Sequence, residues 1–265
     1  MNSTPNTLDF AIELAKEAGQ IMRSNFSLGM KKEWKEDNTP LTVTDEAINE
    51  LVIQKVSATF PDHSVLGEEN SSEVSGSTHV WVVDPVDGTI PFSHGVPTFV
   101  FSLALVINGQ PQVGVIYDPI LDRLLSAEKG KGAYLNGKLI QVGLQRDLKN
   151  TVVNIDGSWV SGGGEAIEVK ELDGVIRNEG AKVTRLCCMA YGGMLVALGE
   201  YSAAICGGVY PWDVAALKII VEEAGGKVTN LKGEEQQYHQ PIYGAVISNQ
   251  PLHEQLVQLL KPFVN

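Results

Sequence analysis

The sequence contains only three cysteines, and its apolar residues never form a long uninterrupted run. Cys187, Cys188 and Cys206 are too few and too unevenly placed for a disulfide framework, so we expect a reducing compartment. No apolar run approaches the roughly 18 residues that a membrane-spanning helix needs. Residues 1–9 lack the basic and apolar regions of a signal peptide. These absences argue against a disulfide-rich secreted domain and a membrane protein, and they predict a cytoplasmic one.

Basic residues are also scarce. The 265-residue chain has 20 lysines and arginines against 32 aspartates and glutamates, which gives a net charge of −12. This balance argues against a nucleic-acid backbone or an anionic membrane as partner, because both repel an acidic surface. A phosphorylated small molecule would have to be attracted by local positive charge, since the field of the whole protein opposes its approach.

The first half of the chain is patterned as two helices followed by an antiparallel meander. Apolar residues recur at helical spacing over residues 8–22 and 48–56, with Thr44 as the expected cap of the second helix. The pair Asn108-Gly109 predicts a tight hairpin turn. Strands are expected at residues 63–66, 80–83, 98–106, 112–117, 123–128 and 132–135.

From about residue 142 the pattern changes to alternating strands and helices. Strands are expected at residues 152–155, 183–186, 202–206, 227–229 and 244–248. Helices are expected at residues 165–176, 189–198, 211–224 and 252–260. Such alternation favours a mixed sheet covered by helices. We therefore predict an α+β protein of two lobes, an antiparallel-sheet lobe over residues 1–142 and a mixed-sheet lobe over residues 143–265.

The most informative segment runs from Trp81 to Thr89 and reads Trp-Val-Val-Asp-Pro-Val-Asp-Gly-Thr. An apolar strand ends here in Asp84 and Asp87, although buried like charges repel each other and lose hydration. A divalent cation removes both costs, and carboxylate oxygens suit Mg²⁺ or Mn²⁺. The glycine and threonine that follow can turn backbone N–H groups towards an anion. The segment therefore predicts metal-assisted phosphate chemistry.

Three further carboxylates stand where they could join such a site. Glu68 follows an apolar strand in Gly67-Glu68-Glu69, and Asp45 and Asp213 stand near the starts of helices. Helix capping and the helix dipole explain Asp45 and Asp213 as well as a metal site does, and Glu68 alone fits a turn. These two interpretations stay open for each residue at this point.

Other catalytic chemistries find little support. No G-x-S-x-G elbow, P-loop or G-x-G-x-x-G motif is present. Neither Cys187 nor Cys188 has a histidine nearby in sequence to activate a thiol. No zinc-type spacing relates the five histidines, which are His63, His79, His94, His239 and His253.

Four linked motifs resemble the inositol monophosphatase family, whose superfamily of Mg²⁺-dependent, lithium-sensitive phosphatases includes fructose-bisphosphatases and bisphosphate nucleotidases. These motifs lie at residues 38–45, 65–69, 81–89 and 212–226. The resemblance implies a layered αβαβα sugar-phosphatase fold and a homodimer. It also implies that a metal-activated water hydrolyses a phosphomonoester, with two to three Mg²⁺ ions bound and Mn²⁺ as a substitute.

The same resemblance implies roles for individual residues. The metal ligands would be Glu68, Asp84, the backbone carbonyl of Val86, Asp87 and Asp213. The catalytic residues, which orient and help deprotonate the attacking water, would be Asp45, Glu68 and Thr89. The substrate contacts would be Asp87, Gly88, Thr89, Cys188, Ala190, Cys206 and Asp213.

This chain departs from the family's pattern where the alcohol part of the substrate would bind. Ile90-Pro91 stands where many members have Thr-Asn, and Cys206 stands where inositol-specific members have a glutamate. A thiol is a weak hydrogen-bond acceptor, so polyol recognition is expected to be weaker or arranged differently. Inositol 1-phosphate is the first candidate substrate, with histidinol phosphate, fructose 1,6-bisphosphate and 3′-phosphoadenosine 5′-phosphate as alternatives. A catalytically silent regulatory or scaffold relative is the rival interpretation, which the loss of a metal ligand would have favoured.

Overall fold

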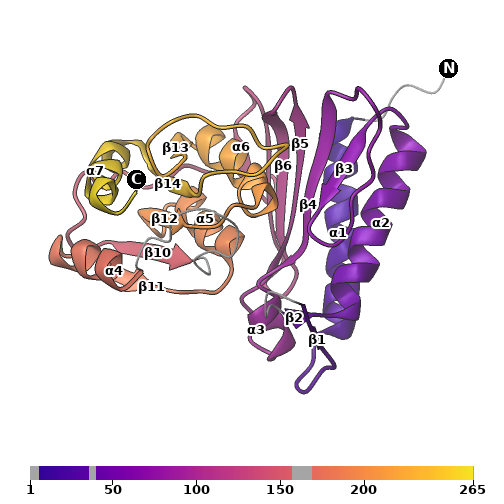
Figure 1. Ribbon diagram of the computed structural model, residues 1–265, viewed down its shortest axis with the longest axis horizontal. Helices are drawn as coiled ribbons and strands as arrows, with labels where there is room; N and C mark the ends of the chain where they lie inside the picture. Colours follow the sequence, from indigo (N-terminus) through magenta and orange to yellow (C-terminus); the bar gives the residue numbers. More distant parts are fainter. Residues whose placement is uncertain (1–5, 36–39, 157–168, 265) are drawn as a thin grey trace.

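The chain folds into two β-sheets with helices outside and between them (Figure 1). The computed structural model describes residues 6–35, 40–156 and 169–264. Its α-helices are α1 (Thr7–Asn25), α2 (Val43–Thr59), α3 (Thr89–Ser93), α4 (Val169–Asn178), α5 (Met189–Ala197), α6 (Ala215–Glu223) and α7 (Gln250–Leu260). Short 3-10 helices span Pro211–Asp213 and Lys261–Phe263.

The larger sheet has seven strands in the order β3-β4-β5-β6-β7-β8-β9. They are β3 (Ser64–Gly67), β4 (His79–Asp87), β5 (Val100–Ile107), β6 (Gln110–Asp118), β7 (Arg123–Glu128), β8 (Ala133–Leu135) and β9 (Lys138–Leu139). The predicted antiparallel meander is confirmed from β4 to β9. Only the pair β3 and β4 is parallel, because residues 68–78 return the chain to the starting end of the sheet.

The smaller sheet has five strands in the order β11-β10-β12-β14-β13 and is mixed, as predicted. They are β10 (Val152–Asp156), β11 (Lys182–Thr184), β12 (Ala203–Cys206), β13 (Gly226–Thr229) and β14 (Ala245–Asn249). β10 runs parallel to both of its neighbours, whereas β14 runs antiparallel to both of its own. A separate two-stranded ribbon pairs β1 (Glu33–Trp34) with β2 (Pro40–Leu41).

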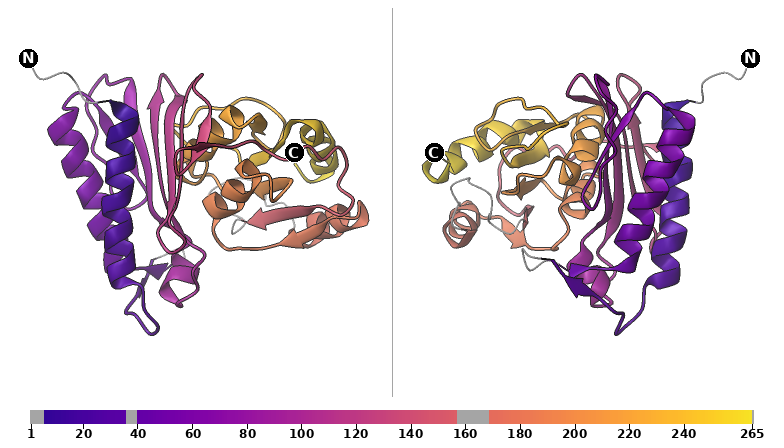
Figure 2. Two further views of the ribbon diagram at one scale, coloured as in Figure 1. Left: turned by 180° about the vertical axis from the view of Figure 1, so that it is seen from behind. Right: turned by 45° about the vertical axis from the view of Figure 1, so that its right-hand side comes forward.

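The elements stack in five layers, which confirms the predicted αβαβα arrangement (Figures 1 and 2). Helices α1 and α2 cover the outer face of the larger sheet, α5 and α6 lie between the sheets, and α4 and α7 cover the smaller sheet. None of the helices in the described parts of the chain is long and apolar enough to cross a membrane.

Burial on both faces explains the apolar run that precedes Asp84. Trp81 and Val83 pack in the core beneath α1 and α2, whereas Val82 points the other way into the core shared with α5 and α6. A strand covered on both faces needs apolar residues at every position. The core between the sheets draws side chains from both halves of the chain. The division of the chain after residue 142 stays a prediction.

Three element boundaries differ from the sequence-based expectation. Thr42, and not Thr44, caps α2: its Oγ accepts the N–H of Thr44 at 3.2 Å. The helix expected from residue 211 begins as a 3-10 turn, and α6 starts only at Ala215. The start of the helix expected at residues 165–176 lies outside the described residues, and α4 is seen from Val169.

Candidate active site

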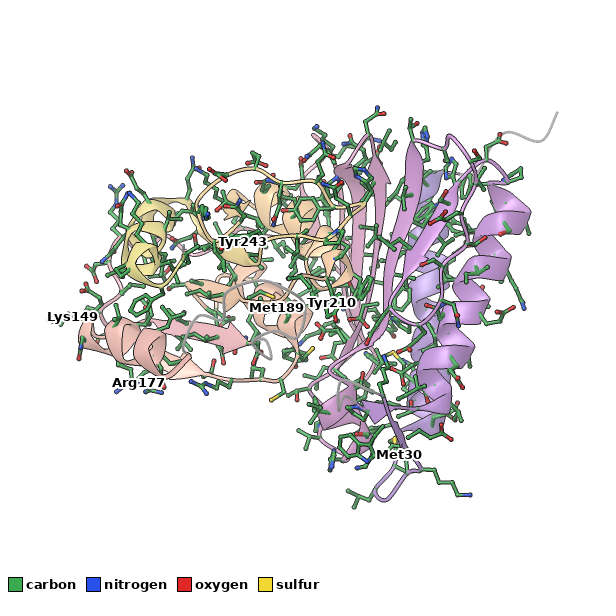
Figure 3. The ribbon with its side chains drawn as sticks, in the orientation of Figure 1. Met30, Lys149, Arg177, Met189, Tyr210 and Tyr243 are labelled. Atoms are coloured by element: carbon green, nitrogen blue, oxygen red, sulfur yellow. The ribbon has the colours of Figure 1, made fainter. Side chains whose placement is uncertain are left out.

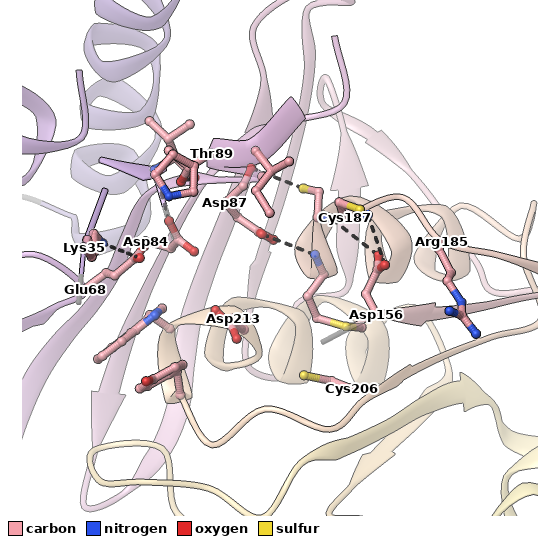
Figure 4. A pocket seen from close by; sticks show the side chains of 18 of the residues that line it. Lys35, Glu68, Asp84, Asp87, Thr89, Asp156, Arg185, Cys187, Cys206 and Asp213 are labelled. Atoms are coloured by element: carbon pink, nitrogen blue, oxygen red, sulfur yellow. Dashed lines mark hydrogen bonds and ion pairs between the residues drawn. The ribbon is translucent and has the colours of Figure 1, made fainter. Parts of the chain in front are cut away.

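A cavity of about 570 Å³ opens between the larger sheet and the loops of the C-terminal half (Figure 4). Most of the predicted site residues line it, namely Glu68, Asp84, Val86, Asp87, Gly88, Thr89, Cys188, Cys206 and Asp213. Asp45 and Ala190 are fully buried behind the wall. They contact Thr89 and Asp87, respectively. The fold therefore brings together residues that lie up to 168 positions apart, from Asp45 to Asp213.

Asp84 and Asp87 both reach the cavity because β4 is irregular between them. In a regular strand, side chains three positions apart point to opposite faces. Asp84 pairs with Ser102 and Asp87 with Val100, so β4 advances three residues where β5 advances two. The extra residue forms a bulge that turns the second carboxylate to the side of the first. β4 therefore continues through the aspartates, and the expectation that the strand ends before Asp84 is wrong.

The carboxylates of Asp84 and Asp87 are buried, that of Asp213 is half-buried, and the charges of this group raise one another's pKa. Burial raises the pKa of Asp84 well above its ordinary value, and the charges of Glu68 and Asp87 raise it further. Burial likewise raises the pKa of Asp87 to about 7. The pKa of Asp213 rises for the same reason, with Asp87 and Glu68 adding to the effect. Within the described residues, no basic side chain forms an ion pair with any of the three.

Glu68 is held differently, by a lysine that sequence reasoning did not single out. Lys35 Nζ lies 2.8 Å from Glu68 Oε1 and 2.6 Å from Glu69 Oε1 (Figure 4). Burial would lower the pKa of Lys35, but the two glutamates outweigh it and raise that pKa. Burial raises the pKa of Glu69 to about 7. Because 33 positions separate Lys35 from Glu68, no local motif pointed to this pair.

Asp45 serves the helix and the site at once. Its Oδ2 accepts the N–H of Thr42 at 2.9 Å and so completes the capping box of α2. Its Oδ1 accepts the hydroxyl of Thr89 at 3.3 Å, and that hydroxyl also lies 2.9 Å from the carbonyl oxygen of Val86. Burial raises the pKa of Asp45 to about 6. The capping interpretation is therefore confirmed, and it does not exclude contact with the site.

Gly88 makes the turn from β4 into α3. Its φ of +90° lies in the left-handed region, which favours glycine. A Cβ at this position would lie 2.7 Å from the carbonyl oxygen of Thr98 and 3.0 Å from Cys188 Cβ. Both the conformation and the close packing therefore require glycine, and the backbone next to Thr89 stays open to the cavity.

The first residues of α5 and the loop before it hold Asp87 from the other side of the cavity. Asp87 Oδ1 accepts the N–H of Met189 at 3.2 Å, and Oδ2 accepts the N–H of Ala190. The thiol of Cys188 donates to the carbonyl oxygen of Asp87 at 3.2 Å. Cys188 and Ala190, which were expected to contact substrate, thus contact Asp87 in this structure.

Asp156, at the end of β10, fixes the shape of that loop. Its Oδ1 accepts the N–H of Cys187 at 3.0 Å, and its Oδ2 accepts the N–H of Leu186 at 3.2 Å. The amide of Asn154 donates to Oδ2 at 2.7 Å. Cys187 has a φ of +54°, which residues with a side chain seldom adopt. Sequence reasoning missed Asp156, although it ends a buried strand just as Asp84 was expected to do.

The carboxylates do not form a preorganised metal-binding site in this structure. In the described ranges, no three histidine, cysteine, aspartate or glutamate side chains converge closely enough to hold an ion. Glu68 is turned to Lys35, Asp84 Oδ1 accepts the N–H of Val86 at 3.0 Å, and Asp87 is turned to the loop. The donor set itself, buried carboxylates beside a backbone carbonyl, fits a hard cation such as Mg²⁺. Binding would require these side chains to turn from their present partners.

The far wall of the cavity is built of sulfur and aromatic groups. Cys206 is buried, and its Sγ accepts the N–H of Gly208 at 3.4 Å. Burial raises the pKa of this thiol well above its ordinary value, and the charge of Asp213 adds to that effect. Tyr210 and Trp212 stack with ring centroids 4.9 Å apart and planes at 9°. Figure 3 shows Tyr210 where the C-terminal half meets the larger sheet.

Fold and site together define a layered α+β protein of the sugar-phosphatase type, with an acidic cavity between its two sheets. The model of the inositol monophosphatase family matches residues 5–263. The chain therefore belongs to this family, whose members are phosphoric monoester hydrolases.

Known proteins agree with this assignment. A histidinol-phosphatase of Chlorobaculum parvum is 37% identical over 237 residues, which cover 88% of each chain. Inositol monophosphatase 2 of Solanum lycopersicum is 38% identical over 240 residues, covering 86% of this chain and 88% of the relative. The solved structure of a Thermotoga maritima IMPase superposes with a TM-score of 0.86 at 30% identity and covers 97% of both chains.

Proposed function

We propose that this protein is a Mg²⁺-dependent phosphomonoesterase that acts on a small phosphorylated alcohol. The observation that carries the proposal is the group of three carboxylates that line the cavity without a basic partner among the described residues: Asp84 and Asp87, which are buried, and Asp213, which is half-buried. Such a group is costly to bury unless a cation joins it. Because the chain belongs to a phosphatase family, we assign the cation to phosphate hydrolysis and the cavity to binding of the phosphate ester.

The residues that would hold Mg²⁺, or Mn²⁺ in its place, are Glu68, Asp84, the carbonyl of Val86, Asp87 and Asp213. We propose two to three ions. When bound, the metal supplies positive charge for the phosphate and lowers the pKa of the attacking water. Lithium, as a competing small cation, is expected to inhibit.

The chain's own residues then position the reactants. The hydroxyl of Thr89, held between Asp45 and the carbonyl of Val86, lies at the cavity wall and would orient the attacking water. Asp45, with Glu68 assisting, would accept a proton from that water through Thr89. Backbone N–H groups of Gly88 and Thr89 would bind the phosphate oxygens.

Inositol 1-phosphate is the first candidate substrate by family resemblance. Histidinol phosphate is a comparable candidate, because the C. parvum relative carries the name histidinol-phosphatase. Fructose 1,6-bisphosphate and 3′-phosphoadenosine 5′-phosphate complete the set to be tested. A catalytically silent role finds no support in the residues, since each expected metal ligand and Thr89 is present at the cavity. A homodimer and a cytoplasmic location complete the proposal.

The test is phosphate release from these four compounds with and without Mg²⁺, in wild type and in Asp84→Asn. We expect turnover that requires Mg²⁺ and that falls at least about a thousandfold in the variant, because one of the residues that would hold the metal is lost. Asp62→Asn makes the same change at an exposed position and serves as the matched control. Unchanged turnover in Asp84→Asn, or full turnover after removal of divalent metal by EDTA, would contradict the proposal.

A further inference from the structure

Apart from the exposed guanidinium of Arg185, which lies 3.6 Å from Asp173, the wall of the cavity that faces the substrate alcohol has few hydrogen-bonding groups to spare. The thiol of Cys188 donates to Asp87, and the sulfur of Cys206 accepts the N–H of Gly208. Both oxygens of Asp156 already accept hydrogen bonds from the protein. A polyol placed here would give up hydrogen bonds to water and regain few of them, which weakens its binding.

The same wall carries a built aromatic surface. Tyr210 and Trp212 both line the cavity, and their rings lie nearly parallel at 4.9 Å. The carbonyl of Trp212 accepts the hydroxyl of Ser102 at 3.3 Å, which ties the turn to β5. Tyr210 is 42% exposed, although the ring of Trp212 covers one side of its ring. The pair is therefore held in place and still accessible.

The position of this pair relates it to the phosphate. Trp212 directly precedes Asp213, a carboxylate of the phosphate end, and both lie in the 3-10 turn Pro211–Asp213. An ester whose phosphate is bound beside Asp84, Asp87 and Asp213 can therefore place its alcohol against Tyr210, which lines the same cavity three positions before Asp213. A flat ring at that wall gains contact area and stacking geometry that a saturated ring of hydroxyl groups does not.

We infer that Tyr210, supported by Trp212, selects phosphomonoesters whose alcohol carries a planar aromatic or heteroaromatic ring. The inference rests on the proposed phosphatase function and specifies its substrate class. Tyr210 acts here as a specificity-determining residue, and the carboxylates and Thr89 are left to act on the phosphate. Aromatic pairs typically gain about 2- to 12-fold beyond their buried area, and we expect selectivity in that range.

The experiment compares two esters that differ only in ring planarity, 2-phenylethyl phosphate and 2-cyclohexylethyl phosphate. Both have a primary alkyl leaving group, so the intrinsic reactivity of the phosphate is matched. With Mg²⁺ present, wild type should show a kcat/KM about 5-fold higher for the phenyl ester. Tyr210→Ala should bring the ratio close to about 1, mainly by raising KM for the phenyl ester. Tyr210→Phe keeps the ring and should keep the ratio.

Tyr134→Ala is the matched control, because Tyr134 lies in β8 outside this cavity and its loss should leave the ratio unchanged. Thermal unfolding of each variant checks that it is folded. If Tyr210→Ala does not fold, the wild-type ratio of the two kcat/KM values still tests whether the protein prefers the planar ring. Hydrolysis of both esters at equal kcat/KM by wild type, or an unchanged ratio in folded Tyr210→Ala, overturns this inference alone. Absence of hydrolysis of every ester, inositol 1-phosphate included, overturns the proposed phosphatase function itself.

Discussion

Asp213 and Lys218 are only five positions apart, yet their surroundings are opposite. Lys218 is buried, whereas Asp213 is half-buried at the wall of the cavity. Asp213 lies among Asp87 and Glu68, whose charges oppose its ionisation. Lys218 Nζ lies 2.7 Å from Glu222 and 2.6 Å from Glu235, and it donates to the carbonyl oxygen of Val228 at 2.9 Å.

Lys218 is an example of a polar group that stabilises the fold, and Asp213 is an example of one that destabilises it. All three donors of the Lys218 ammonium are used, so its burial is compensated. Asp84, Asp87 and Asp213 have no such compensation, because no basic side chain in the described part of the chain pairs with them, and their repulsion destabilises the fold. A protein keeps such a group where a ligand or an ion will complete it. Mutation of the cavity carboxylates is therefore expected to lower activity and raise stability. Mutation of Lys218 is expected to lower stability and leave activity nearly unchanged.

The largest effect is expected from Asp213→Asn. We expect kcat/KM for any substrate to fall by at least about a thousandfold, equivalent to about 4 kcal/mol, because a metal ligand is lost. In the absence of Mg²⁺ the variant should be more stable than wild type by about 1–3 kcal/mol, because a half-buried carboxylate that Asp87 and Glu68 repel is replaced by a neutral amide. Phosphate release and urea unfolding in EDTA measure the two changes. A variant that is both inactive and less stable would show that the carboxylate is compensated after all.

His253 offers a pH-dependent test in the well-compensated region. Its Nδ1 lies 2.8 Å from the hydroxyl of Ser248 and its Nε2 lies 2.9 Å from that of Thr229. Burial, together with the positive charges of Lys227 and Lys218, lowers its pKa to about 4.

Between about pH 6.5 and pH 4 the unfolded chain therefore binds a proton at His253 that the folded protein does not, so acid destabilises the fold. Between pH 7 and pH 5 this residue should remove about 2 kcal/mol of stability. Urea unfolding of wild type and His253→Gln at both pH values isolates the term, since the other groups are common to both. Equal pH dependence in the two proteins would show that His253 is protonated without cost.

Asp156 is the intermediate case, a carboxylate at the cavity whose partners are all in place. Asp156→Ala should make the loop before α5 more mobile, because Leu186 and Cys187 lose the acceptor of their N–H groups. The hydrogen bonds from Met189 and Ala190 to Asp87 should weaken as a result. Supporting residues of metal ligands typically contribute 10- to 100-fold to activity or metal affinity. We expect a loss of about that size, recovered in part at high Mg²⁺, which a general defect in folding would not show. Asp147→Ala, at an exposed carboxylate, is the control and should keep full activity.

The smallest effect on activity is expected from Lys218→Met. The variant keeps the length of the buried chain but leaves the carbonyl of Val228 without its donor, which costs about 1–3 kcal/mol of stability. Since Glu222 and Glu235 reach solvent, they tolerate the loss of their partner. Activity at 25 °C should stay within about twofold of wild type. A large loss of kcat in the folded variant would show that α6 transmits strain to Asp213.

The sequence by itself determined which residues form the proposed phosphate end of the site. Asp84, Asp87, Gly88 and Thr89 lie within six consecutive residues, so one segment encodes the carboxylates, the left-handed turn and the hydroxyl. Local rules also gave the hairpin at Asn108-Gly109, where both residues have a positive φ as such a turn requires. The periodicity of apolar residues and the residue preferences of turns depend on only a few neighbouring positions, so they can be recognised without knowing the fold.

Tertiary structure alone decided what surrounds those residues. The loop that binds Asp87 comes from 103 positions away at Ala190, and Lys35 reaches Glu68 across 33 positions. The bulge that turns Asp84 and Asp87 to one side arises from pairing with β5, which no property of β4 alone reveals. The wall formed by Tyr210 and Trp212 exists only because the C-terminal sheet packs against the first through α5 and α6. Contacts of this kind depend on how layers pack, and packing is a property of the whole chain.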